Sequence, residues 1–557
     1  MEATATLSTI PHLPPLSPKH TAPKSSFSHS PFTIFPSSHV IHYQKPSKSN
    51  PQASTSRNQS GGDRGVGRGR ETRERNLEVS PHRAVAAVRL LRIERGGAFA
   101  DLLNDTGKGS GRNEMEYVEK TLGFCTRELD SRDLKLVTSI VGGAIRWRKY
   151  LDYLIVSLFN EKNAFANMEP LLLQILRIGS YEIVKTDVPP YAAVHENVNL
   201  AKLALRPGAG NMVNAILRKL AMLKEDNSLP SPSLDGDDCT FWRALATIHS
   251  HPVWMVKRWI QHIGLEAAIQ LMTWNNTEPC FSLRANMGKG LTRANLITQL
   301  NMLNVTHEPS MPLDEFVRIR TGMQAVIQAG LLKDGLCSVQ DESAGLVVSV
   351  VDPRPGDNII DCCAAPGGKT LFMASRLSGQ GMIHAIDINK GRLRILQETA
   401  YLQQVNSVVT AVHSDLRTFA ESCKVKFDKV LLDAPCSGFG VLSKRPDLRW
   451  NRKFEDLEEL KKLQDELLDA SSKLVKAGGV LVYSTCSIDP EENEERVAAF
   501  LLRRPEFCID PADRYVPQTF LTEQGFYRSC PVEHSMDGAF AARLLLHSSG
   551  ENSNQAS

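Results

Sequence analysis

The chain has 557 residues, with 65 lysines and arginines against 62 aspartates and glutamates, which gives a formal net charge of +3. This length predicts two to four domains, and a hydrophobic fraction of 42% is enough for packed cores, which excludes a wholly disordered chain. No stretch approaches the roughly eighteen apolar residues of a membrane span, so we expect a soluble protein that contacts no membrane. The eleven cysteines form no CxxC pair and no Cys/His cluster, so we expect neither a disulfide framework nor a bound metal.

The first sixty residues differ from the rest of the chain in composition. They contain one acidic residue and five basic ones, and roughly a third of them are serine or threonine. Such a segment does not fold alone and is typical either of a disordered tail or of a transit peptide. Because arginine is nearly absent before Arg57 and no basic amphipathic helix is evident, we favour a chloroplast location, with the mitochondrion as the alternative. We assign residues 1–76 to a transit peptide and a disordered, Gly/Arg-rich linker.

The slight positive excess of the chain lies in this N-terminal segment. Residues 1–75 hold ten of the 65 basic residues and four of the 62 acidic ones, which leaves 55 against 58 for the remainder. A polyanionic partner must then be held by local cationic faces, because no global positive field is available.

Residues 77–225 have a helical pattern. Apolar residues recur at helical spacing, as in Val194, Val198, Ala201 and Leu205, and alternating β-branched runs are few, so we predict an all-α domain. The cations of this region form either a solvated helical face or a surface that follows phosphates. They include Arg83, Arg89, Arg92, Arg146, Arg148, Lys149, Arg218 and Lys219.

A Pro-, Ser- and Asp-rich linker at residues 224–239 separates this domain from a middle segment, residues 240–335. The middle segment begins with a predicted amphipathic helix in HPVWMVKRWIQHIG and continues with a short strand and a helix. We therefore predict a small α+β module. Arg284 and Asn286 could contact RNA, but single polar residues such as these are more often structural.

From residue 336 to residue 548, short apolar runs alternate with helical stretches. The runs are 358–364, 382–388, 407–415, 428–435 and 478–487. Alternating strands and helices predict a parallel, doubly wound α/β sheet, whose ligands lie at the carboxyl ends of the strands. The polar residues at those ends are Asp361, Asp387, Asp415, Asp433, Cys436 and Cys486.

The motif CCAAPGGKT follows the first of these strands. It is not a phosphate-binding P-loop, because Cys363 stands where that motif needs glycine, and the dinucleotide fingerprint GxGxxG is absent. The glycines instead predict a tight turn that lets the backbone approach a small cofactor. Asp387 is positioned to hold a ribose and Asp415 an adenine, without a phosphate cradle. This pattern points to S-adenosylmethionine.

Two further motifs, DAPCSGFG and YSTCSIDPEENE, carry cysteines after the fourth and fifth strands. Cysteine at these places favours attack on carbon rather than on an exocyclic nitrogen. C5 of a pyrimidine is too weak a nucleophile to take a methyl group, but addition of a thiolate at C6 activates it. The alternative is that both cysteines are buried small hydrophobic residues.

The motifs CAAPGGK, PCSG, STCS and KRPDLRWN resemble those of the NOL1/NOP2/Sun family of RNA cytosine-5 methyltransferases. The segments GAIRWRKYLDYLI, LRIGSYEI, HENVNLAKL and VNAILRKL resemble a NusB-like RNA-binding domain. The combination is most similar to the bacterial Sun (Fmu) type, which methylates small-subunit ribosomal RNA. The resemblance implies a Rossmann-like class I methyltransferase domain behind an all-α NusB-like domain, with S-adenosyl-L-methionine as cofactor. It also implies methylation of ribosomal RNA, which for this chain would be plastid 16S rRNA.

The resemblance also implies roles for single residues. Cys486 would be the nucleophile on cytosine C6, Cys436 would assist proton removal and product release, and Asp433 would contact the base near N3 and border the cofactor. Asp387 would hold the ribose and Asp415 the adenine, and Arg445 and Arg449 are candidates for contacts with the RNA backbone. The remaining cofactor-lining positions would be Cys363, Ala364, Ala365, Pro366, Gly367, Gly368 and Lys369.

Two other functions stay open. One is the same cytosine-5 chemistry on transfer RNA, and the other is a non-catalytic RNA-binding factor in ribosome assembly that keeps a vestigial cofactor fold. The intact cysteines and cofactor turn count against the second. We expect a monomer.

Overall fold

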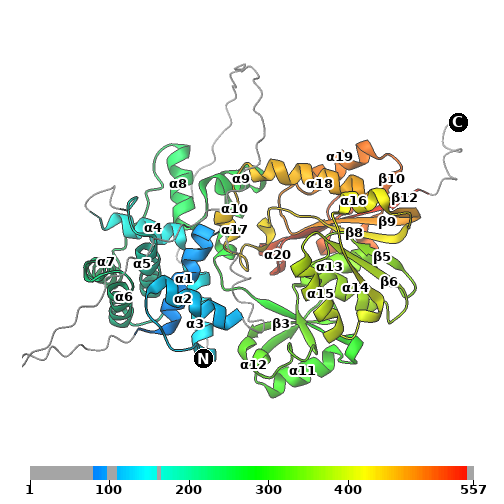
Figure 1. The fold of residues 1–557 in the computed structure, drawn as a ribbon. Coiled ribbons are helices and arrows are strands. Elements are labelled where there is room, and N and C mark those ends of the chain that lie inside the picture. Colours follow the sequence, from blue (N-terminus) through cyan, green and yellow to red (C-terminus); the bar gives the residue numbers. More distant parts are fainter. Residues whose placement is uncertain (1–78, 97–109, 160–164, 548–557) are drawn as a thin grey trace, which may run out of the picture. The chain divides into compact units, whose positions relative to one another are not determined.

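A computed structural model describes residues 79–96, 110–159 and 165–547, without the side chains of residues 110–113 (Figure 1). The predicted transit peptide at residues 1–76 lies outside the described residues. Among the helices of the described residues, none is long and apolar enough to cross a membrane. No group of three or more His, Cys, Asp or Glu side chains in this part of the chain could hold a metal ion.

The front of the described chain consists of helices packed around one apolar core. Proline is the first residue of four of them, where its missing N–H costs no helical hydrogen bond and its fixed φ suits the helix. The prediction of an all-α domain is confirmed. The helices are α1 (Pro81–Gly96), α2 (Ser110–Leu122), α3 (Ser131–Arg146), α4 (Arg148–Ser157), α5 (Pro170–Lys185), α6 (Pro190–Ala204) and α7 (Pro207–Glu225).

Several cations of this domain that the sequence pattern placed on the surface are buried. Arg83 forms an ion pair with Glu182 at 2.8 Å, and Arg89 forms one with Glu114 at 2.7 Å. Arg146 donates to the backbone oxygen of Ser443 at 2.8 Å. The surface prediction is therefore wrong for these three arginines, since each one holds helices or domains together. Arg218 and Lys219 are exposed, as predicted.

The middle segment begins with three helices, and a four-stranded antiparallel sheet with the order β2-β3-β1-β4 follows them. The helices are α8 (Asp238–Ile248), α9 (Val253–Ile263) and α10 (Leu265–Asn275), with α11 (Arg293–Met302) and α12 (Met323–Gln328) on the sheet. The strands are β1 (Phe281–Ala285), β2 (Thr306–Pro309), β3 (Phe316–Thr321) and β4 (Cys337–Val339). Arg284 is buried and donates to Gln340 at 2.8 Å, and Asn286 is buried and donates to the backbone oxygen of Gly335, so both are structural.

The last domain is built on one large sheet with the strand order β10-β12-β9-β8-β5-β6-β7. The five strands from β9 to β7 are parallel, whereas β12 pairs antiparallel with β9, β10 and β11. The predicted Rossmann-like fold is confirmed, but the sheet is mixed rather than wholly parallel. The strands are β5 (Asn358–Asp361), β6 (Met382–Asp387), β7 (Val409–His413), β8 (Phe427–Asp433), β9 (Val475–Thr485), β10 (Phe507–Ile509), β11 (Tyr527–Ser529) and β12 (Ala539–Leu546).

Two apolar cores lie on the two faces of this sheet. One contains side chains of α13, α14 and α15, and the other contains side chains of α16, α18 and α19. Figure 1 shows these two groups of helices on opposite sides of the sheet. This is the two-sided cover that a parallel sheet requires. The helices are α13 (Glu342–Val351), α14 (Gly368–Arg376), α15 (Lys390–Leu402), α16 (Leu416–Ser422), α17 (Leu448–Asn451), α18 (Asp456–Ser472), α19 (Glu494–Arg503) and α20 (Pro531–His534).

The stretch around α17 joins the three domains. Arg449 is fully buried and donates to the backbone oxygens of Arg146, Ser250 and Asn275. The adjacent Trp450 donates through Nε1 to the backbone oxygen of Ile145 at 2.8 Å. The prediction that Arg449 contacts the RNA backbone is therefore wrong, because its guanidinium is fully buried and donates to internal carbonyls.

Candidate active site

The glycine turn after β5 brings the backbone close to neighbouring elements, as its sequence predicts. Gly367 has a φ of +112°, and a Cβ there would lie 2.8 Å from Cγ of Leu396, so only glycine fits. Gly368 begins α14, and the nearest atom to a Cβ placed on it would be Nε2 of Gln340 at 3.8 Å. The N-terminus of α14 is thus open to a small ligand on the side of Gly368.

Asp387, the last residue of β6, is tied to this turn. Its Oδ2 accepts the N–H of Ala365 at 3.0 Å, and its Oδ1 accepts the N–H of Asn389 at 2.7 Å. Each carboxylate oxygen has a second lone pair, which is what recognition of a ribose diol requires. Asp387 therefore lies where the sequence analysis placed it, beside the turn and at the end of the neighbouring strand.

Asp415 follows β7 and caps α16. Its carboxylate accepts the backbone N–H of Arg417 at 2.8 Å and forms an ion pair with the guanidinium of the same residue at 2.7 Å. Hydrogen bonding from the Arg417 side chain lowers the pKa of Asp415. The adenine contact of Asp415 stays a prediction. In the structure the residue also caps α16 and pairs with Arg417.

Asp361 at the end of β5 is 1% exposed, and its Oδ2 accepts a hydrogen bond from Thr370 at 2.7 Å. Its Oδ1 has no hydrogen-bond partner. Burial, helped by the nearby Asp433 and Asp387 charges, raises the pKa of Asp361 to about 7. An unpartnered buried polar atom beside an open glycine turn fits a cofactor with a polar or cationic group, such as the amino acid end of S-adenosylmethionine.

Lys369 and Asp433 form an ion pair between the cofactor turn and the end of β8. Nζ of Lys369 lies 2.7 Å from Oδ2 of Asp433, while the hydroxyl of Ser484 donates to Oδ1 at 3.0 Å. Burial alone would lower the pKa of Lys369, but the Asp433 carboxylate outweighs it and the pKa is raised. Lys369 therefore stays protonated and holds Asp433 in place.

The two predicted catalytic cysteines lie together. Their sulfur atoms are 3.3 Å apart, and both cysteines are free thiols. The hydrogen bond with Cys436 lowers the pKa of Cys486 below its usual value, because the Cys436 thiol can donate to a Cys486 thiolate. Burial and Asp433 oppose this shift, and the Lys369 charge acts in the same direction as the hydrogen bond. The same hydrogen bond, together with burial, raises the pKa of Cys436. The pair thus combines a thiol whose pKa is lowered with a thiol whose pKa is raised, which suits nucleophilic catalysis by Cys486.

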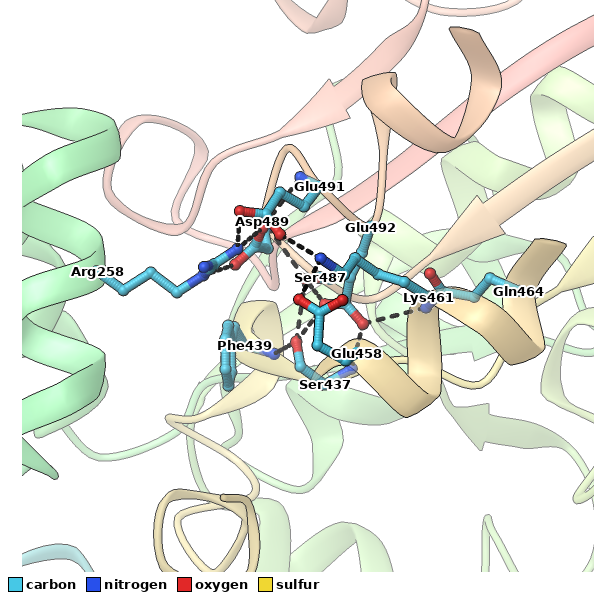
Figure 2. Close-up of polar contacts among 10 residues, drawn as sticks. All are labelled: Arg258, Ser437, Phe439, Glu458, Lys461, Gln464, Ser487, Asp489, Glu491 and Glu492. Carbon is cyan, nitrogen blue, oxygen red and sulfur yellow. Dashed lines mark hydrogen bonds and ion pairs between the residues drawn. The ribbon is translucent and has the colours of Figure 1, made fainter. Parts of the chain in front are cut away.

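Sequence reasoning missed the residues that hold these two thiols. A buried carboxylate, Glu492, lies between the serines that follow the two cysteines, Ser437 and Ser487 (Figure 2). The available signal was the acidic run DPEENEE directly after an apolar strand, because acids at such a place are often buried and paired.

Known proteins match all three domains. The family of 16S rRNA methyltransferases RsmB/F matches residues 348–545, the NusB family matches residues 98–222, and the ferredoxin-like domain of RsmF/B-like methyltransferases matches residues 251–325. The probable ribosomal RNA small subunit methyltransferase B of Bacillus subtilis (strain 168) is 31% identical over 83% of this chain and 98% of its own length. The chain belongs to the RsmB/F family of methyltransferases.

Other relatives agree with this membership. A probable ribosomal RNA small subunit methyltransferase B of Synechocystis sp. (strain ATCC 27184 / PCC 6803 / Kazusa) is 33% identical over 75% of this chain and 92% of its own length. The crystal structure of PH0851 has a TM-score of 0.67 and 25% sequence identity, and the match covers 84% of this chain and 99% of that one. The predicted family, the three-part fold and the dependence on S-adenosylmethionine are confirmed for this RsmB/F methyltransferase.

Proposed function

We propose that this RsmB/F methyltransferase transfers a methyl group to C5 of a cytosine in small-subunit ribosomal RNA, specifically plastid 16S rRNA. The observation that carries this proposal is the pair of free thiols 3.3 Å apart beside the Lys369–Asp433 ion pair, with the pKa of Cys486 lowered and that of Cys436 raised. Such a pair suits carbon methylation through a covalent adduct, whereas nitrogen methylation needs no thiol.

The residues of the chain divide the chemistry between them. The Cys486 thiolate forms a bond from Sγ to cytosine C6, which makes C5 nucleophilic, and Asp433 contacts the base near N3. S-adenosylmethionine supplies the methyl group that C5 takes. A water molecule then takes the C5 proton with the assistance of Cys436, the electrons of that C–H bond re-form the C5–C6 double bond, and the Sγ–C6 bond breaks. Cys486 leaves as a thiolate, so each turnover restores the starting state.

The substrate class follows from the relatives, which are named as ribosomal RNA small subunit methyltransferases. We therefore place ribosomal RNA ahead of transfer RNA and ahead of a non-catalytic assembly role. The test incubates the purified protein with S-adenosylmethionine and either protein-free plastid 16S rRNA or plastid transfer RNA, and maps 5-methylcytosine by bisulfite sequencing. A new 5-methylcytosine in 16S rRNA that Cys486→Ala fails to produce supports the proposal. Modification of transfer RNA alone, or of neither RNA, contradicts it.

The chloroplast location rests on the composition of residues 1–76, which lie outside the described residues. A fusion of residues 1–75 to a fluorescent reporter should enter chloroplasts. Reporter that stays in the cytosol or enters mitochondria would contradict this part of the proposal. A loss-of-function plant line should then lack the corresponding 5-methylcytosine in plastid 16S rRNA.

A further inference from the structure

The carboxylate of Glu492 joins the two cysteine-bearing turns. Glu492 is 1% exposed, and its Oε2 accepts the hydroxyls of Ser437 and Ser487, each at 2.5 Å (Figure 2). Its Oε1 accepts the backbone N–H of Ser437 at 2.8 Å and Nε2 of Gln464 at 3.1 Å. Three of these four donors belong to the residues that directly follow Cys436 and Cys486.

This contact sets how close the two thiols come. The hydroxyls of Ser437 and Ser487 are themselves 3.1 Å apart, so the carboxylate closes a small ring between the turns. The cysteines are one residue earlier in each turn, and their two sulfur atoms are 3.3 Å apart. A second tie runs through the backbone, where the N–H of Gly440 donates to the oxygen of Cys486 at 3.0 Å. The side chain of Glu492 is the only acid that contacts both serines among the described residues.

The segment that carries Glu492 is anchored from outside the catalytic domain. Arg258, on α9 of the middle segment, forms ion pairs with Asp489 at 2.5 Å and with Glu491 at 2.9 Å (Figure 2). The backbone N–H of Asp489 in turn donates to the hydroxyl of Ser487 at 3.1 Å. The acids of the DPEEN stretch thus have separate tasks: Asp489 and Glu491 attach to the middle segment, and Glu492 turns inward to the serines.

We propose that Glu492 is a positioning residue that holds Cys436 within hydrogen-bond reach of Cys486 and thereby keeps Cys486 activated. The proposal rests on the proposed function for its catalytic meaning. Glu492 itself touches neither sulfur in a hydrogen bond, and it acts through Ser437 and Ser487.

The direction in which the pKa of Cys486 changes when Glu492 is replaced separates a positioning role from the effect of the Glu492 charge alone. The ionisable groups that face the Cys486 thiol are Cys436, Asp433, Lys369 and Glu492. The negative charge of Glu492 by itself raises the pKa of Cys486, so removing only the charge lowers that pKa. If Glu492 positions Cys436, its loss breaks the hydrogen bond between the thiols and the pKa of Cys486 rises instead.

The first experiment measures the rate at which iodoacetamide alkylates Cys486 as a function of pH, by peptide mass spectrometry on the full chain without RNA. Glu492→Ala should raise the apparent pKa of Cys486 by about half a unit or more, equivalent to about a threefold change in thiolate population below the pKa. Glu492→Gln keeps the shape and can bond both serines, so its pKa should stay at or below that of the wild type. Glu495→Ala, which removes an exposed acid in the first turn of the following helix α19, is the matched control and should change nothing.

A fall in the Cys486 pKa in Glu492→Ala would show that Glu492 acts as a charge alone. An unchanged pKa with a lower melting temperature would show a purely structural role. Either result overturns the proposal. If Glu492→Ala does not fold, Ser487→Ala removes one of the four donors, and it should raise the pKa by a smaller amount.

The second experiment measures steady-state methylation of the RNA and the amount of covalent adduct. Glu492→Ala should lower kcat about 100-fold with less than about a threefold change in the KM for RNA, and it should accumulate covalent RNA adduct as Cys436→Ala does. If Glu492→Ala lowered kcat/KM by the same factor only through a higher KM for RNA, this would contradict a positioning role. If the wild type makes no 5-methylcytosine in any RNA, the proposed function fails, but the alkylation experiment still decides the role of Glu492.

Discussion

The turns after β8 and β9 carry the same Cys-Ser pair, yet they surround their thiols differently. Cys436 is 8% exposed, and its pKa is raised by its hydrogen bond with Cys486 and by burial. The same hydrogen bond and the positive charge of Lys369 lower the pKa of Cys486. The residue type is the same in both turns, so the difference in role comes from the neighbours alone. The opposite pKa shifts of the two thiols therefore distinguish the nucleophile from its partner.

The largest effect is expected when the thiol with the lowered pKa, Cys486, is removed. Cys486→Ala should lower methyl transfer by at least about 1,000-fold, because C5 is not activated without the adduct at C6 and the pKa of the neighbouring Cys436 is raised. The measurement is incorporation of labelled methyl groups from S-adenosylmethionine into 16S rRNA. Cys125→Ala, which removes an exposed thiol, is the control and should keep full activity. Activity retained in Cys486→Ala would reassign the nucleophile.

Removing the partner thiol should have a smaller and different effect. Cys436→Ala should lower turnover about 100-fold and trap the Cys486–RNA adduct, since proton removal and release lose their helper. The adduct is read as a slowly migrating band on a denaturing gel. Normal turnover without the band would mean that another group removes the C5 proton.

The effect of the Lys369 charge on the pKa of Cys486 can be tested by substitution of Lys369. Lys369→Met removes the positive charge, which should raise the pKa of Cys486, so the thiolate would form only at higher pH. At a pH below the wild-type pKa, alkylation of Cys486 without cofactor should slow about three- to tenfold. Lys369→Arg keeps the charge and should stay within about twofold of the wild type. An unchanged rate in Lys369→Met would leave the hydrogen bond from Cys436 as the sole cause of the lowered pKa.

The smallest expected effect belongs to the hydroxyl that orients Asp433. Ser484→Ala removes one side-chain hydrogen bond, typically worth about 1 kcal/mol net, while Asp433 keeps its ion pair with Lys369, so kcat should fall about fivefold. The melting temperature and the alkylation rate of Cys486 should stay close to those of the wild type. A loss as large as that of Cys436→Ala would indicate that Ser484 contacts the reacting base.

Much of the active site follows from sequence, because it is built from local signals. Each parallel strand ends in a turn, and residues of those turns meet at one edge of the sheet whatever the rest of the chain does. Asp361, Asp387, Asp433 and the two cysteines were therefore placed correctly relative to the strands. Gly367 was also predictable, because only glycine accepts its φ of +112° against Leu396.

The errors concern charged residues whose partners are distant in sequence. Arg89 and Arg449 look like surface cations in the sequence, yet Arg89 is paired with Glu114 and Arg449 is enclosed by carbonyls of two other domains. The antiparallel strand β12 likewise depends on a partner, β9, more than fifty residues earlier. Helical periodicity reports which face is apolar, but it does not report which cations another domain will cover.

The sequence by itself determined the three-part organisation, the glycine turn, the strand-end acids and the presence of two cysteines suited to carbon methylation. Only the tertiary structure decided which thiol is activated and what holds the pair together. The reason is physical: the pKa of a thiol depends on donors and charges within a few ångströms, and these come from separate segments. Cys436, Lys369 and Glu492 reach Cys486 only after the sheet, the cofactor turn and the acidic stretch have folded onto one another.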